Sequence, residues 1–250
     1  MDRRRFIEKG ILTGIAATQF GAFMSGSPGD KIYNTAIIGA GWWGNNILGE
    51  AMASGKCKIT GICDVDRNYI DQTVQRVEKT TGHRPKGYGD YREMLHEQKP
   101  EITIIASPEH WHALQAIEAM KTGSHVYLEK PIAHTINEGK ALVAAAEKYG
   151  RVIQVGLHRR ASPHCRQGID LIRQGRIGKV KMIRAFVYSD TADTFIDPMP
   201  EAPEYLDWNM YLGPADYQPY APSIHPRGFR RFLNFTNGVI GDWGVHWMDQ

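Results

Sequence analysis

A glycine-rich turn followed by an acid at a fixed distance constrains the fold of this chain more than any other feature. The turn is G-A-G-W-W-G at residues 39–44, between an apolar stretch at 33–38 and a helical pattern at 45–53. A second apolar run, 59–63, ends directly before Asp64, twenty residues after the last glycine of the turn. A strand, glycine turn, helix and second strand in this order form a βαβ unit that binds dinucleotides. The sequence therefore predicts such a site.

Each residue of the turn has an expected role. Gly39 permits the tight turn, Gly41 lets the backbone approach a pyrophosphate, and Gly44 lets the helix pack closely on the strand. Free N–H groups at the helix N-terminus would bind the phosphates. Trp42 and Trp43 are predicted to line the same cofactor site.

Asp64 favours NAD over NADP, because a carboxylate accepts hydrogen bonds from ribose hydroxyls and repels a 2′-phosphate. Arg67 lies three residues further on and leaves NADP open as the cofactor. An ordinary glycine turn is the alternative for such a motif taken alone, and the strand, helix and acid in register favour the cofactor site.

The composition is that of a soluble globular protein with a small-molecule partner. The chain has 250 residues, enough for two modest domains, with 42% hydrophobic and 23% charged residues. Its net charge is only +3 and no basic stripe occurs, so nucleic acid is not an expected partner. Three cysteines without a C-x-x-C motif argue against a disulfide framework or a zinc site.

Residues 1–30 are expected to be a targeting segment outside the fold. Arg3-Arg4-Arg5-Phe6-Ile7 precedes an uncharged run over 10–29, which is the layout of a signal peptide. The start resembles a twin-arginine signal, so we expect the export machinery of that pathway to carry the folded protein to the periplasm or another extracytoplasmic compartment. Glycine and polar residues dilute the run, so no stable membrane span is expected. A frayed basic terminus is the alternative.

Strands and helices alternate between residues 33 and 155, which predicts an α/β fold with a parallel sheet covered on both faces. The expected strands are 33–38, 59–63, 101–106, 124–128 and 151–155, and the expected helices are 45–53, 68–81, 90–97, 109–121 and 135–149.

The pattern changes after residue 157, so we expect a cofactor domain over 31–157 and a substrate domain over 158–250. The second region contains an expected helix at 163–174 and an alternating, half-buried strand at 180–189. Residues 197–228 are rich in Pro, Tyr and Trp, which favours a long ordered loop over another surface.

Two loops follow predicted strands at the sheet edge where ligands bind. The first is Glu129-Lys130-Pro131. Lys130 could form a hydrogen bond to the reacting hydroxyl or shuttle its proton. Glu129 is expected beside the cofactor, and the bond before Pro131 could be cis. A surface ion pair is the alternative. The second loop is S-P-E-H-W-H at 107–112, from which Ser107 is expected to meet the ribose and His112 to line the pocket.

Further candidates lie elsewhere along the chain. His110 is expected to pack rather than react. His158 and Arg160 could contact the substrate, with a solvated basic link as the alternative. Asp242 and His246 are four residues apart, so a helix would place them on one face.

A carboxylate beside an imidazole orients the ring and stabilises its charged form, which makes His246 a candidate general base. Trp243 is a candidate substrate contact. Asp242 and His246 are also metal-ligand types, but no third ligand is evident and no metal is expected. A helix-start acid and a packed histidine are the alternative.

Together the motifs resemble the Gfo/Idh/MocA oxidoreductases, which include glucose–fructose oxidoreductase and inositol dehydrogenase. The motifs are G-A-G-x-x-G at 39–44, C-D-V-D at 63–66, S-P-E-H-W-H at 107–112, E-K-P at 129–131, V-G-L-H-R-R at 155–160, I-G-K-V at 177–180 and G-D-W-G-V-H at 241–246. The twin-arginine start and L-G-P-A at 212–215 resemble the exported bacterial branch.

The resemblance implies an N-terminal Rossmann domain and a C-terminal α/β domain with an open, mostly antiparallel sheet. It implies that Lys130 lies near the nicotinamide, that Asp242 and His246 flank the substrate, and that His246 is the acid/base. Hydride would pass between a sugar or cyclitol carbon and the nicotinamide, and association into a homo-oligomer through the open sheet is a further expectation. In this family more sheet follows the D-x-x-x-H segment, so the end at Gln250 suggests a truncated product.

Two alternatives to a simple dehydrogenase remain open. The first is a redox-neutral sugar-processing enzyme, for glycoside cleavage or sugar–sugar oxidoreduction, with a tightly bound and internally recycled NAD(P), because an exported enzyme meets no obvious pool of NAD. The second is a non-catalytic binding protein on the same fold.

Overall fold

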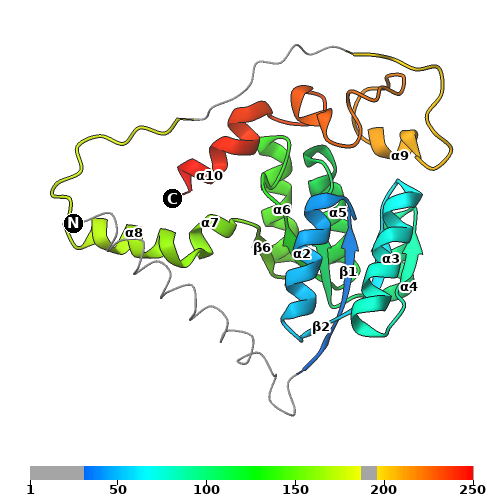
Figure 1. Cartoon of the computed structure of the whole chain (residues 1–250), viewed down its shortest axis with the longest axis horizontal. Helices are drawn as coiled ribbons and strands as arrows, with labels where there is room; N and C mark the ends of the chain where they lie inside the picture. The colour runs from blue at the N-terminus through cyan, green and yellow to red at the C-terminus, as the bar shows by residue number, and fades with distance from the viewer. Residues whose placement is uncertain (1–30, 187–195, 250) are drawn as a thin grey trace, which may run out of the picture.

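The computed structural model describes residues 31–186 and 196–249, and its first part is a doubly wound α/β domain (Figure 1). Six parallel strands lie in the order β3-β2-β1-β4-β5-β6. The strands are β1 (Tyr33–Ile38), β2 (Cys57–Cys63), β3 (Lys86–Tyr88), β4 (Ile102–Ile105), β5 (His125–Leu128) and β6 (Ile153–Val155). The helices between them are α2 (Trp42–Ala53), α3 (Arg67–Thr81), α4 (Tyr91–Gln98), α5 (Glu109–Lys121) and α6 (Ile136–Tyr149).

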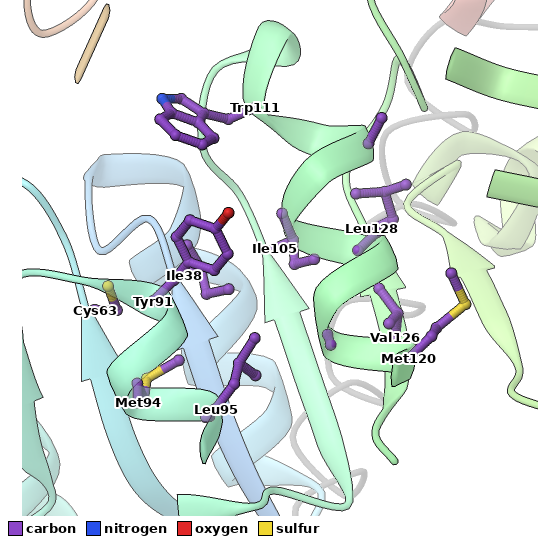
Figure 2. Close-up of a cluster of buried hydrophobic side chains, with 14 of the residues drawn as sticks. Ile38, Cys63, Tyr91, Met94, Leu95, Ile105, Trp111, Met120, Val126 and Leu128 are labelled. Carbon is purple, nitrogen blue, oxygen red and sulfur yellow. The ribbon is translucent and has the colours of Figure 1, made fainter. Parts of the chain in front are cut away.

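Neighbouring residues of the central strands point to opposite faces of the sheet and build two cores. Ile37 belongs to a cluster on one face with Leu48 of α2 and Val74 of α3. Ile38 belongs to the cluster on the other face, which Figure 2 shows with Ile105 and with side chains from α4 and α5. Both strand faces are covered, which explains why the strands read as apolar runs rather than as alternating patterns.

Most expected elements are confirmed, with small differences at their ends. Helix α5 has the predicted bounds, and α6 begins after Thr135, which forms a capping box with Glu138. Helix α2 begins at Trp42 rather than at Asn45, because Gly41 is its N-cap. Strand β3 was not predicted, since three residues are too few to show a periodic pattern.

The rest of the described chain consists of short helices and loops. They are α7 (His158–Ala161), α8 (Pro163–Arg173), α9 (Trp208–Leu212), the 3-10 helix η2 (Gly228–Arg231), the π-helix η3 (Ile240–Gly244) and α10 (Val245–Met248). No strand occurs among the described residues after Val155, so they do not form the antiparallel sheet that the resemblance implies.

The expected strand at 180–189 is wrong for residues 180–186, which are exposed and belong to no sheet. An alternating pattern makes a strand only where a neighbouring strand completes its hydrogen bonds, and no described segment does so here. Residues 187–189 lie outside the described part.

Residues 197–237, here called the covering segment, lie across the end of the domain where the strands finish (Figure 1). The segment has a small core of its own that includes Leu206, Tyr211 and Phe235. The backbone N–H of Asp207 donates to the carbonyl of Val65 at 2.9 Å, directly after β2. The expectation of an ordered loop over another surface is therefore confirmed.

The expected targeting segment, residues 1–30, lies outside the described residues. Within the described ranges, every helix is too short or too polar to cross a membrane.

Candidate active site

A cavity of about 640 Å³ lies where the carboxyl ends of the strands meet the covering segment. The strand order reverses between β1 and β4, and ligands of such sheets bind in the crevice at this point. The cavity brings together all but one of the predicted site residues. Those that line it are Gly39, Gly41, Trp42, Trp43, Gly44, Asp64, Ser107, His112, Glu129, Lys130, His158, Asp242, Trp243 and His246.

The three glycines of the turn have different surroundings. Gly39 has a φ of +91°, and a Cβ there would lie 2.6 Å from the carbonyl carbon of Ala106. A Cβ on Gly44 would lie 1.9 Å from the carbonyl oxygen of Gly39, so the turn and the close packing require glycine at both positions. A Cβ on Gly41 would meet nothing within 4 Å, although Gly41 lines the cavity. This open space beside the N-terminus of α2 fits the pyrophosphate of a dinucleotide.

Asp64 directly follows β2 and holds the glycine turn against the end of that strand. Its carboxylate accepts hydrogen bonds from the backbone N–H of Ala40 at 2.6 Å and of Asp66 at 3.0 Å. Burial raises the pKa of Asp64 to about 6. Each carboxylate oxygen keeps a second lone pair, so the group still fits a ribose diol in the cavity that it lines.

Arg67, the residue that kept NADP open, does not line the cavity. Its guanidinium donates to the carbonyl of Glu204, and its backbone N–H donates to the carbonyl of Tyr205 at 2.8 Å. Arg67 therefore fastens the covering segment to the start of α3.

Lys130 lies in a buried network of charges. The Lys130–Pro131 peptide bond is cis, as the sequence allowed. The Lys130 ammonium donates to the carboxylate of Asp242 and, at 2.8 Å, to its backbone carbonyl. Arg230 donates from Nε to the other carboxylate oxygen at 3.0 Å. The side chains of Lys130 and Asp242 are only 12% and 6% exposed.

The expected pairing of Asp242 with His246 is wrong. The Asp242 carboxylate is bound by Lys130 and Arg230, because two cations outcompete a neutral imidazole. Asp242 also lies on the π-helical turn η3 and His246 on α10, so the four residues from one to the other do not follow regular α-helical spacing.

His246 instead lies against other rings. Its ring centroid is 4.8 Å from that of His158 and 6.2 Å from that of Trp243. Burial, together with the charge of Lys130, lowers the pKa of His246 to about 4. The imidazole is therefore neutral at pH 7 and able to accept a proton. Its Nδ1 is shielded and has no hydrogen-bond partner among the described residues, which leaves Nε2 as the atom for that proton.

His112 joins the two loops that end β4 and β5. The ring is buried, with Nδ1 2.7 Å from the carbonyl oxygen of Pro131 and Nε2 2.8 Å from that of Ser107. The Ser107 hydroxyl donates to Gln115 at 2.6 Å. His112 thus contributes to the cavity wall and braces the backbone on which Lys130 is carried.

His110 packs, as expected, with its ring centroid 5.0 Å from that of Phe235 and a ring nitrogen 3.0 Å from the carbonyl of Tyr211. Beside it, Glu109 accepts hydrogen bonds from the Thr236 hydroxyl at 2.7 Å and from the Asn237 backbone at 3.1 Å. Sequence reasoning missed this buried link, since a glutamate in a helix's first turn ordinarily faces solvent.

Arg160 is the predicted site residue that the structure excludes from the cavity. It forms an ion pair with Asp249, with Nε 2.9 Å from Oδ2. Its neighbour Arg159 lines the cavity instead and lies 3.9 Å from the ring centroid of Trp247. Helix α7 is packed so that His158 and Arg159 face the cavity, whereas Arg160, turned about 100° further around the helix axis, reaches Asp249.

Two further lining residues, Arg227 and Arg230, come from the covering segment and were not predicted. No sequence motif predicts these two arginines, because they reach the cavity only when the covering segment folds back over the sheet.

Comparison with known proteins agrees with the fold and with a dinucleotide cofactor. The sequence model of a family described as "Oxidoreductase family, NAD-binding Rossmann fold" matches residues 33–157. The model of that family's C-terminal alpha/beta domain matches residues 185–250.

Individual curated relatives share about 30% sequence identity with this chain. The chain is 30% identical, over 60% of its length, to glycosyl hydrolase family 109 protein 1 of Akkermansia muciniphila, of which it covers 32%. It is 29% identical, over 69% of its length, to the uncharacterized oxidoreductase YrbE of Bacillus subtilis, of which it covers 47%. The chain thus spans less than half the length of these relatives.

A solved structure shows the same fold. The WlbA dehydrogenase from Chromobacterium violaceum, crystallised with NADH and UDP-GlcNAcA, is 27% identical with a TM-score of 0.53 over 60% of this chain and 42% of that one.

Proposed function

Because the chain belongs to the Gfo/Idh/MocA family of NAD-binding oxidoreductases, we propose that it transfers hydride between a carbinol carbon of a sugar or cyclitol and the nicotinamide of NAD. One observation carries this proposal. Lys130, from the loop after β5, and His246, from α10, line the same cavity as the glycine turn. A proton acceptor, a fixed positive charge and a dinucleotide site are the groups that alcohol oxidation requires.

The residues would divide the work as follows. The N-terminus of α2 binds the phosphates, and Asp64 accepts hydrogen bonds from the ribose. The dinucleotide, when bound, supplies the hydride acceptor. His246 accepts the hydroxyl proton at Nε2, and the charge of Lys130 stabilises the oxygen that loses it. Asp242 holds Lys130 in place, and Trp243 and His158 contact the sugar.

Denaturing release of bound nucleotide, followed by mass spectrometry, is the first test. The protein is then mixed with NAD or NADP and a panel of sugars and cyclitols, and absorbance at the wavelength of the reduced cofactor is followed. We expect NAD to be bound and reduced by at least one polyol. A protein that binds neither dinucleotide would contradict the proposal.

The similarity to a glycosyl hydrolase family 109 protein favours a second candidate. In this candidate a sugar carbon would lose hydride to bound NAD, and the ketone that forms acidifies the neighbouring C–H bond. Loss of that proton would expel the aglycone as an alcohol, water would add to the unsaturated ketone, and the hydride would return to the ketone carbon before release. Aryl glycosides incubated in D₂O without added NAD distinguish the two. Deuterium beside the oxidised carbon, without accumulated reduced cofactor, supports the second candidate, whereas net reduction of NAD with a free polyol supports the first.

Export by the twin-arginine pathway remains part of the proposal and rests on residues 1–30. It is consistent with the second candidate, since an exported enzyme that recycles its cofactor needs no external NAD.

A further inference from the structure

Two exposed residues from distant parts of the chain meet at the edge of the cavity. Trp42, in the first turn of α2, lines the cavity although its side chain is 61% exposed. The guanidinium carbon of Arg227, from the covering segment, lies 5.0 Å from the centroid of the Trp42 ring. Because both residues line the cavity and are also exposed, their contact lies at the edge of the cavity.

The backbone on both sides of Arg227 is held firmly. Ile224 is fully buried and Phe229 is 7% exposed in the core of the covering segment. A Cβ on Gly228 would lie 1.7 Å from the carbonyl oxygen of Ser223, so the turn that carries Arg227 is closely packed. The guanidinium is therefore presented to Trp42 by a folded support.

The position of this contact relates it to the cofactor. Trp42 directly follows Gly41, where open space beside the N-terminus of α2 fits a pyrophosphate. A dinucleotide bound there would bring the negative charge of its phosphates to the side of the cavity that holds Trp42 and the Arg227 guanidinium.

We propose that Arg227 and Trp42 form a clasp that retains the dinucleotide and must open before it can leave. The proposal rests on the cofactor site of the proposed function and adds a positioning role for Arg227. The clasp would slow the release of the cofactor. Slow release is what the redox-neutral candidate requires, because its cofactor is recycled within the enzyme.

The clasp should slow the dissociation of NADH and of NADPH to the same extent. A cation over an indole face interacts through the ring and not through the ribose, so the clasp retains NADH and NADPH alike. An arginine that binds the 2′-phosphate would instead slow the dissociation of NADPH alone.

The test measures the dissociation rates of NADH and NADPH from the full chain by stopped-flow fluorescence. Arg227→Ala and Trp42→Ala should each raise both rates roughly 2- to 30-fold, the range that corresponds to a cation–π contact. The double variant should dissociate no faster than about the quicker single variant, because both changes remove one contact. Trp42→Phe, which keeps a ring, should lie between wild type and Trp42→Ala.

Arg231→Ala is the matched control, since Arg231 ends the 3-10 helix that begins directly after Arg227 but does not line the cavity. Its rates should equal those of wild type. Thermal melts of the cofactor-free variants identify any loss of folding, and Arg227→Gln replaces Arg227→Ala if the latter unfolds.

Three results would overturn the clasp: wild-type dissociation rates in Arg227→Ala, an effect confined to NADPH, or additive effects in the double variant. If wild type binds no dinucleotide, the proposed function itself has failed, which is a separate and recognisable outcome.

Discussion

Alanine at two glycines of the same turn should separate the requirements of the fold from those of the ligand. A Cβ on Gly44 would lie 1.9 Å from the carbonyl oxygen of Gly39, far inside the ~3.5 Å of van der Waals contact. A Cβ on Gly41 would meet nothing within 4 Å in the protein. Gly44→Ala should therefore destabilise the fold, and Gly41→Ala should impair only cofactor binding.

The expected magnitudes follow from these surroundings. Moving α2 away from the Gly39 carbonyl costs about 1–3 kcal/mol, offset by the roughly 0.5–1 kcal/mol that alanine gains over glycine in a helix. A net cost of up to about 2.5 kcal/mol lowers the Tm of a chain of this size by up to about 10 °C. At Gly41, with φ −67° and ψ −171°, alanine fits the backbone. Its weaker N-capping and its smaller unfolded-state entropy nearly cancel, so the Tm should stay within about 2 °C.

Circular dichroism melts of the cofactor-free proteins and NADH titrations at 25 °C provide the measurements. Gly41→Ala should bind NADH at least about tenfold more weakly, because its methyl group occupies the path of the pyrophosphate. Equal loss of Tm in both variants, or NADH affinity unchanged in Gly41→Ala, would refute the reasoning.

Two other predictions concern single groups of the cavity, and a third concerns a glycine packed against Glu129 of the cavity wall. Lys130→Met should lower kcat for polyol oxidation about 100- to 1000-fold, the range for a group that stabilises charge on a reacting oxygen, and unchanged turnover would remove Lys130 from the reaction. NAD affinity should fall by up to about tenfold per pH unit between pH 6 and pH 5, because burial raises the pKa of Asp64 to about 6 and the protonated carboxyl loses an acceptor for the ribose. Binding titrations of Asp64→Asn should be flat over this range, and a persisting pH dependence would assign it to another group. Gly156→Ala should cost about 1–3 kcal/mol in urea unfolding, because its Cβ would lie 2.3 Å from Oε1 of buried Glu129. If the cost is the same in a Glu129→Ala background, this contact is not its cause.

Local patterns were sufficient for the cofactor half of the fold. Apolar runs bounded by glycine and proline located five of the six strands, because buried parallel strands are apolar on both faces. The roles of Gly39 and Gly44 followed from the motif, since a tight turn and a close helix contact are short-range requirements. The position of Lys130 at the cavity followed from one rule, that ligands bind at the carboxyl ends of parallel strands.

Contacts between distant segments could not be read from local patterns. The spacing of Asp242 and His246 suggested a pair, but the tertiary structure brings Lys130 and Arg230 to the carboxylate and leaves the imidazole among rings. Arg160 was preferred to Arg159, although only the packing of α7 decides which of two neighbours faces the cavity.

The sequence by itself thus determined the βαβ framework, the glycine turn and the acid that follows β2, because each depends on neighbours within one or two elements. Only the tertiary structure decided which charges meet Asp242, how far the pKa of His246 falls, and that Arg227 reaches Trp42. The contacts of Arg230 with Asp242 and of Arg227 with Trp42 depend on where the covering segment returns across the sheet. That path is set by the burial of its own apolar core and by hydrogen bonds to Val65 and Arg67, which no local periodicity encodes.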